Sequence, residues 1–436
     1  MTDTVPPTPF RPDEHEAASA APTEAGKPAE SGETTNSLRV AILAGLLLLV
    51  ALTGGLYMVG VIVALIIMIF LHELGHYVTA RRSGMKVTEF FIGFGPRIWS
   101  FRRGETEYGI KAIPAGAYVK IIGMNSLDDF HNPADESRTY RQATFPRRFL
   151  VGVAGSAMHF IQAFVLLFIL LTAFGMSEDD VWNIGTISGL DEGSTVPAAD
   201  AGLELDDRIR AVDGTSVVTF EDLRQEIQAR PGALVTLSVE RDGQFFETTT
   251  VLAETNPQGE PVGFLGIGPD HPRQTVGPIA AVGDSAEFMW EFGSGSILAL
   301  ADFFSPGNLS EYVDRVVGNG PDRTGDLITD ADGRLLSPVG AVRIASDVAE
   351  DDFANLLGFL VSINIFVGIF NLVPLPPLDG GLLAVATYER LRERGGRRHH
   401  IDYSRVLPVT ATVVVLLGVL GLSALYLDSL DLVGVG

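Results

Sequence analysis

Hydrophobic residues are concentrated in four long blocks, and polar residues fill the stretches between them. None of the blocks contains Asp, Glu, Lys or Arg, and each exceeds the roughly 20 residues that a helix needs to cross a bilayer core. They are Val40–Leu71, Phe149–Phe174, Phe353–Val373 and Leu407–Leu427. The pattern predicts a polytopic α-helical membrane protein.

The first block is longer than one crossing requires. As a single helix its 32 residues would extend about 48 Å, against roughly 30 Å of hydrocarbon. Gly54 and Gly55 lie inside it, and paired glycines disfavour a continuous helix. We therefore favour a break that separates an extra span at 38–53 from a second helix at 56–80. A single long tilted helix is the alternative.

The charges between the blocks predict the side of the membrane on which each polar segment lies. Residues 81–148 hold 12 Lys and Arg against 7 Asp and Glu, and the loop 388–405 holds six Arg. Residues 175–352 hold 10 Arg against 33 Asp and Glu. Because positively charged loops stay in the cytoplasm, we expect the first two segments to be cytoplasmic and the acidic insert to be extracytoplasmic.

Composition adds further limits on structure and function. Residues 1–37 are rich in Pro, Glu, Ala, Ser and Thr, which predicts a disordered acidic cytoplasmic tail. An N-terminal membrane domain at 38–174 and a C-terminal membrane domain at 353–436 enclose the insert. The net charge of −23 argues against nucleic-acid binding, and the absence of cysteine excludes disulfides and thiolate metal ligands.

The predicted helix at 56–80 carries the sequence His-Glu-Leu-Gly-His at 72–76, directly after the first block. Histidines four positions apart lie on one face of a helix, so His72 and His76 can bind one zinc ion, and Glu73 can accept a proton from water held there. A soluble core helix with two hydrogen-bonded histidines is the alternative. The apolar surroundings argue against it, because polar groups at membrane depth are costly and are functional candidates.

Residues 90–123 predict a β-hairpin, because β-rich pieces alternate with Gly and Pro. Gly93, Gly95, Pro114 and Gly116 are the interruptions. A protease needs an extended substrate, and a strand edge beside the metal helix would hold one by β-augmentation. A hairpin with only a structural role is the alternative.

The acidic insert begins with short strands around one helix and Asp-Gly turns, an order that resembles a PDZ domain at 182–268. Such a groove would receive an extended peptide or a chain terminus. No carboxylate-binding loop is recognisable, so steric filtering of substrates is an equal alternative. Residues 275–352 are expected to be an extracytoplasmic linker with an amphipathic helix at 285–304.

Asp379 is the candidate third metal ligand. It follows prolines and precedes Gly380-Gly381 at the end of the third block, where an interrupted helix is tolerated only if the backbone is buried in protein or lines a wet cavity. A carboxylate at this depth needs a positive partner, and zinc held by two neutral histidines would provide one. Capping of the next helix is the alternative role.

These motifs together resemble the bacterial site-2 protease family of intramembrane zinc metalloproteases, of the actinobacterial type that regulates sigma-factor signalling. The resemblance covers roughly residues 56–427. It is carried by HELGH, by the GFGP and IPAGAYVK stretches, by the PDZ-like insert and by NLVPLPPLDGG at 371–381.

The resemblance implies a role for individual residues. His72, His76 and Asp379 would hold one Zn²⁺ per chain, and Glu73 would be the general base. Asn371 would help to hold the substrate strand. The stretches 93–96 and 113–120 match a β-hairpin of the family that re-enters the membrane. Members of the family cut single-pass proteins, often anti-sigma factors, after a first protease has removed the outer portion. The PDZ part is thought to exclude uncut substrates.

One motif departs from the family pattern. The second block of the family begins AGPxxNF, whereas this chain has Ala-Gly-Ser-Ala-Met-His-Phe at 154–160. His159 would then lie near the zinc site as an additional polar group, or would be an ordinary packing residue.

The sequence therefore predicts a zinc metalloendopeptidase of the bacterial plasma membrane, with its zinc site near the cytoplasmic side. Its partners would be single-pass membrane proteins and the lipid bilayer, with no nucleic acid and no small-molecule substrate. A membrane protease that cuts soluble segments and a zinc-binding scaffold that recruits partners through the PDZ-like insert are the alternatives.

Overall fold

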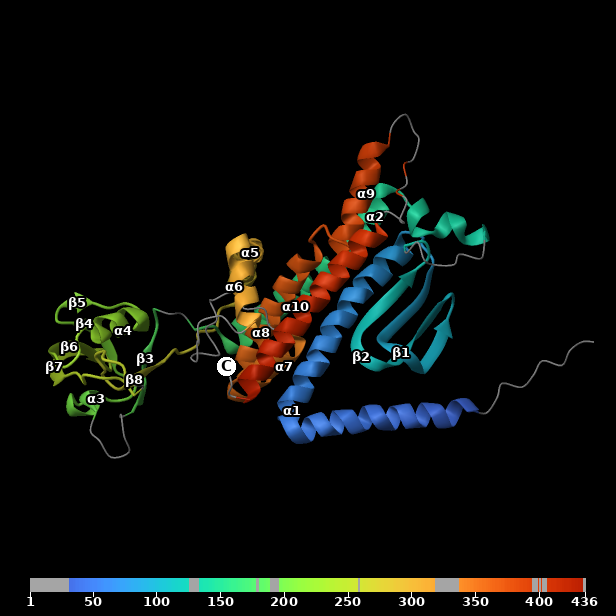
Figure 1. Ribbon diagram of the computed structural model, residues 1–436. Helices are drawn as coiled ribbons and strands as arrows, with labels where there is room; N and C mark the ends of the chain where they lie inside the picture. The colour runs from blue at the N-terminus through green and yellow to red at the C-terminus, as the bar shows by residue number, and fades with distance from the viewer. Residues whose placement is uncertain are drawn as a thin grey trace, which may run out of the picture.

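The computed structural model describes residues 31–124, 133–177, 180–188, 196–257, 259–317, 337–393, 399, 401 and 406–433. Most of the acidic tail and the segment 318–336 lie outside these ranges. A bundle of long helices forms the centre of the molecule, a β-hairpin lies beside its first helix, and the insert lies beyond one end of the bundle (Figure 1).

Among the described residues, four helical segments are long and apolar enough to cross a membrane. They are Gly55–Arg82, Phe145–Phe174, Phe353–Asn371 and Leu407–Ser429. The first is the second part of α1 (Ser31–Arg82), and the second comprises α2 (Phe145–Ile169) and a π-helical turn, Leu170–Phe174. The others are α8 (Phe353–Asn371) and the first part of α10 (Leu407–Val433). The prediction of a polytopic helical membrane protein is confirmed.

Helix α1 bends at the position where the sequence predicts a break. Gly55 has φ 74° and ψ 176°, a conformation outside the helical region that glycine adopts without a Cβ clash. The part before Gly55 runs across the direction of the part after it (Figure 1). The segment 38–53 is not among the four candidate spans, and its role as a separate span stays a prediction.

The hairpin consists of two long antiparallel strands that both fold back on themselves, β1 (Val87–Arg103) and β2 (Thr106–Ile121). Phe90 pairs with Tyr108 on one side and with Val119 on the other. The result is a curled sheet in which the last segment of β2 pairs with β1 along only one of its edges. Gly93 and Gly95 provide the bend in β1, with φ of 86° and 80°.

The insert has its own hydrophobic core. A four-stranded sheet runs in the order β5-β4-β6-β7, and β3 pairs with β8. The strands are β3 (Asn183–Ile187), β4 (Arg208–Val212), β5 (Thr215–Ser216), β6 (Leu234–Arg241), β7 (Gln244–Val251) and β8 (Ile267–Asp270). The helices are α3 (Pro197–Asp200) and α4 (Phe220–Gln228). These elements occupy the region in which the sequence predicts short strands around one helix, with the short α3 as a second helix.

One buried charge of the insert is explained by a specific partner. The Asp207 side chain is fully buried, and a buried carboxylate is costly unless it is paired. Arg241 donates to both of its oxygens, at 2.6 and 2.7 Å, and these bonds raise the pKa of the guanidinium.

The region after the insert packs onto the bundle more extensively than a linker would. It forms α5 (Pro278–Phe303), α6 (Pro306–Val316) and α7 (Pro338–Asp351). Ala281 of α5 is buried with residues of α2 and α8, and Ala345 of α7 is buried against Val61 of α1. These contacts make α5 and α7 part of the helical core.

Helix α9 (Asp379–Arg392) is fixed by a buried ion pair. The Arg148 Nη1 of α2 donates to Oε2 of Glu389 at 2.5 Å, and both side chains are at least 90 % buried. The Arg148 guanidinium also lies over the Tyr140 ring, 5.0 Å from its centroid. Because α9 begins at Asp379, this pair connects α2 to the helix that carries the predicted third ligand.

Candidate zinc centre

Three side chains from two distant parts of the chain converge between α1 and α9. The His72 and His76 Nε2 atoms lie 3.2 Å apart. Asp379 Oδ2 lies 3.5 Å from the first and 3.2 Å from the second. Asp379 is the first residue of α9, and Leu378, not Asp379, is the capping residue. The aspartate therefore faces the histidines and does not cap its helix.

The arrangement of these atoms fits a bound cation. The His76 Nδ1–H donates to the Val151 carbonyl oxygen at 2.8 Å, so Nε2 of the neutral ring presents a lone pair to the cluster. Asp379 Oδ2 is buried and accepts no hydrogen bond from any described residue. Lone pairs that face one another at this distance repel unless a positive charge lies among them.

The spacing of the three atoms also suits zinc. Ligand atoms on a tetrahedral zinc with bonds of about 2.0–2.1 Å lie roughly 3.3–3.4 Å apart. The observed separations are 3.2, 3.2 and 3.5 Å. Imidazole and carboxylate are ordinary zinc ligands, and three of them leave a fourth position for water.

Helix α2 closes the site on one side through a glycine. A Cβ built on Gly155 would lie 2.5 Å from His76 Nε2 and 2.6 Å from His72 Nε2. Only a residue without a side chain allows α2 to approach the two rings this closely.

We expect Gly155→Ala to lower zinc affinity at least about tenfold, because the added methyl group would displace both imidazoles. Bound zinc would be measured by competition with a chromogenic chelator. Gly60→Ala is the matched control, since a Cβ at this position of α1 meets nothing within 4 Å. Equal zinc affinity in the two variants would contradict the proposed contact.

His159 has a specific partner beside the cluster. Its ring centroid is 4.9 Å from that of His72, and its Nδ1 lies 3.0 Å from Asn364 Oδ1. Asn364 also donates to the Leu360 carbonyl oxygen at 2.8 Å. Asn364 was not predicted from the sequence, although a polar residue in the middle of an apolar span is the kind of signal that marks such a group.

A cavity of about 510 Å³ joins the cluster to the hairpin. Glu73, His76 and Asp379 line it on one side. Residues 118–121 of β2 line it on another, and the backbone of Val119 interacts with the Glu73 carboxyl group. The general base predicted from the sequence therefore lies beside both the metal ligands and a strand edge.

The predicted substrate-binding residues do not line this cavity. Gly93, Gly95, Pro114 and Gly116 belong to the bends of the hairpin and are not among the residues that line this cavity. Asn371 is the half-buried last residue of α8 and does not line it either. Residues 118–121 line the cavity, and the part of Asn371 and of the four hairpin residues in substrate binding stays a prediction.

Most of the chain matches a known protein family. The profile of Peptidase family M50 matches residues 60–416. The chain belongs to peptidase family M50. This result confirms the expected site-2 protease family, the metalloendopeptidase activity and the dependence on zinc.

The relatives of this M50 peptidase are described as zinc metalloproteases. Zinc metalloprotease Rip1 of Mycobacterium tuberculosis is 32% identical over 389 residues, which cover 81% of this chain and 92% of the relative. The Mycolicibacterium smegmatis protein of the same name is 31% identical over 80% of this chain and 91% of the relative. A putative zinc metalloprotease of Rhizobium meliloti is 28% identical over 76% and 86%.

A solved structure matches part of the M50 chain. The PDZ domain of an SdrC-like protein from Listeria monocytogenes aligns with 22% of this chain and 92% of its own, at 19% identity and a TM-score of 0.18.

Proposed function

We propose that this M50 peptidase hydrolyses peptide bonds in or near the transmembrane segments of single-pass membrane proteins, with anti-sigma factors as an example. The observation that supports it is the shared cavity, in which His76, Asp379, Glu73 and the strand edge at 118–121 meet beside a membrane-spanning helix.

The cluster and the residues beside it have different roles in this proposal. His72, His76 and Asp379 hold the zinc ion, which when bound polarises a carbonyl group and makes water more acidic. Glu73 removes a proton from the attacking water and later delivers it to the leaving amine. His159, oriented by Asn364, lies behind His72 and packs against its ring.

The strand edge would hold the substrate in extended form. Ile122 N donates to the Lys86 carbonyl oxygen, toward β1. Because successive residues of a strand direct their N–H groups to opposite sides, Val119 and Ile121 direct theirs away from β1, toward the cavity. A helical substrate hides these bonding groups in its own hydrogen bonds, so cleavage requires it to unwind onto such an edge.

We expect Val119→Pro to lower the rate of cleavage at least about tenfold, or about 1.4 kcal/mol, since proline removes the N–H group that contacts the Glu73 carboxyl group and that would bond the substrate. Val119→Ala keeps the N–H and should retain near-normal cleavage. Zinc content should be equal in both variants. Equal cleavage by the proline variant would remove this edge from substrate binding.

The proposed orientation places the zinc site near the cytoplasmic face and the insert outside. The basic residues Arg81 and Arg82 end the helix that carries His76, and the acidic insert lies at the opposite end of the bundle (Figure 1). In this arrangement the hairpin enters the membrane beside α1 from the cytoplasmic side.

The insert would act on substrates from the outside. A cavity of about 310 Å³ runs between α4 and β8, with Leu223 and Ile227 on the helix side and residues 264–268 on the strand side. A groove between a helix and a strand suits an extended peptide. A bulky uncut outer domain would be excluded, and a trimmed chain would pass.

The function can be tested in proteoliposomes with a single-pass reporter. We expect the full chain to cut a reporter that lacks its outer domain within the membrane segment, and to spare the untrimmed form. Phenanthroline should stop the reaction, and added zinc should restore it. Mass spectrometry would locate the cut. Cleavage only in soluble segments would instead indicate a loop-cutting protease, and an uncut reporter would indicate a scaffold.

A further inference from the structure

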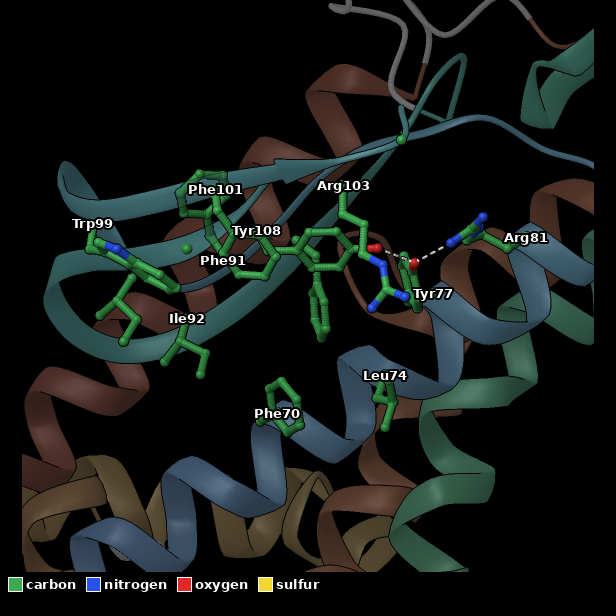
Figure 2. A pocket seen from close by; sticks show the side chains of 14 residues that line it. Phe70, Leu74, Tyr77, Arg81, Phe91, Ile92, Trp99, Phe101, Arg103 and Tyr108 are labelled. Atoms are coloured by element: carbon green, nitrogen blue, oxygen red, sulfur yellow. Dashed lines mark hydrogen bonds between the residues drawn. The ribbon is translucent and has the colours of Figure 1, made fainter. Parts of the chain in front are cut away.

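A second cavity lies between α1 and the hairpin and shares no lining residue with the cavity of the catalytic cluster. It measures about 680 Å³ and lies between α1 and the concave side of the sheet (Figure 2). Its walls are almost entirely apolar and aromatic. They include Phe70, Leu74, Phe91, Ile92, Trp99 and Phe101.

The two ends of this groove differ in chemistry. Trp99 and Phe101 lie at one end and are 57% and 45% exposed. At the other end the Tyr77 and Tyr108 hydroxyls hydrogen-bond, and Arg81 Nη1 donates to the Tyr77 hydroxyl at 2.7 Å. Arg103 reaches toward the same tyrosine from the hairpin (Figure 2).

The two guanidinium groups have charge available for a ligand. Within the described part of the chain, neither Arg81 nor Arg103 forms an ion pair with a carboxylate. The Glu105 carboxylate, which is close enough to interact electrostatically with Arg81, makes two bonds of 2.6 and 2.7 Å to Arg138. Two arginines and two phenols therefore surround a position that suits an anion with several oxygens.

We propose that this groove binds an anionic phospholipid, with its phosphate between Arg81 and Arg103 and one acyl chain along the aromatic wall. One wall of the groove is the last part of the membrane-spanning segment Gly55–Arg82, a position that suits an occupant soluble in the bilayer. The groove is basic at the end beside the last turn of the span and apolar along the rest of its length. A phospholipid has the same two parts, an anionic headgroup and an apolar tail.

A lipid at this position would also contact the strand that positions the catalytic edge. Phe90 stacks on Phe70 and Tyr77, with ring centroids 5.3 Å apart in each pair, and it pairs across the sheet with Val119. The lipid fills the space beside these rings and holds the hairpin against α1. Bound lipid therefore stabilises the position of residues 118–121.

The proposal can be tested with the full chain in nanodiscs of phosphatidylcholine, to which phosphatidylglycerol is added. Retained lipid would be measured by native mass spectrometry. We expect the double variant Arg81→Gln/Arg103→Gln to bind phosphatidylglycerol roughly thirtyfold more weakly, which corresponds to about 2 kcal/mol for two arginines. The double variant Arg82→Gln/Arg102→Gln removes the same charge from neighbouring positions outside the groove and should retain the lipid.

The two double variants distinguish a specific lipid site from a basic surface that attracts anionic lipid in general. Equal loss of lipid in both would show general attraction and overturn the proposal, and so would equal retention. A photo-crosslinking residue in place of Trp99 should form a lipid adduct. An adduct with a single-pass reporter in its place would make the groove a substrate site.

Discussion

Glu73→Gln should slow proteolysis by orders of magnitude while zinc stays bound. The amide has nearly the shape of the carboxylate but cannot accept a proton from water, so the general-base step is lost. General acid–base groups contribute about 10²- to 10⁴-fold to rate, and we expect a decrease in this range. Glu73 lines the cavity but is not one of the three clustered donors, so the metal should remain. Single-turnover cleavage of the trimmed reporter and metal analysis of the same sample would measure both quantities.

Two controls make this experiment specific. Glu105→Gln is the same change at an exposed carboxylate of the hairpin, and it should leave cleavage unchanged. Glu73→Asp keeps the base but shortens its reach, so it should retain part of the activity. If the glutamine variant cuts the reporter at the normal rate, Glu73 is not the base.

The parts of the structure that local sequence determines were predictable. Three apolar blocks long enough to cross a bilayer correspond to α2, α8 and α10, and the bounds of the spans agree within a few residues. The agreement is expected because the hydropathy of a span is a property of one continuous segment. The two glycines before Leu56 predicted the bend in α1, since the preference of glycine for non-helical conformations is local too. His72, Glu73 and His76 needed only the helical repeat to be placed on adjoining faces.

Contacts across long sequence separations were not predictable in the same way. Arg148 and Glu389 are 241 positions apart, and His159 and Asn364 are 205 apart. The sequence around these four residues does not indicate which partner each one has, because the pairing depends on how the helices pack. Asp379 was an exception, since a carboxylate at membrane depth requires a cation and the histidines supply a site for one.

The hairpin shows the same limit in a different form. Gly93, Gly95, Pro114 and Gly116 identified its bends correctly, but a bend only redirects the chain. The strand that reaches Glu73 is the one after the last bend, and this follows from the double pairing of Phe90. A sequence pattern gives the strands, whereas their order in a sheet depends on tertiary contacts.

Asp379→Ala should remove zinc and therefore all peptidase activity. The carboxylate supplies one of three donors, and without it two imidazoles from one helix remain. Loss of a residue that only hydrogen-bonds to a metal ligand lowers metal affinity about 10- to 100-fold. Loss of a ligand itself should therefore lower zinc affinity more than about 100-fold. Zinc per chain would be measured after dialysis against a weak chelator, with cleavage of the reporter in parallel.

The matched control and the reverse experiment test the geometry itself. Asp347→Ala removes a carboxylate that is 70% exposed on α7, and it should retain zinc and activity. Asp379→His returns a donor atom at the same helix terminus, so it should recover part of the zinc without necessarily recovering turnover. Full zinc occupancy in Asp379→Ala would mean that the metal is held by a different set of residues. The proposed roles of α9 and of the buried pair that fixes it would then both be wrong.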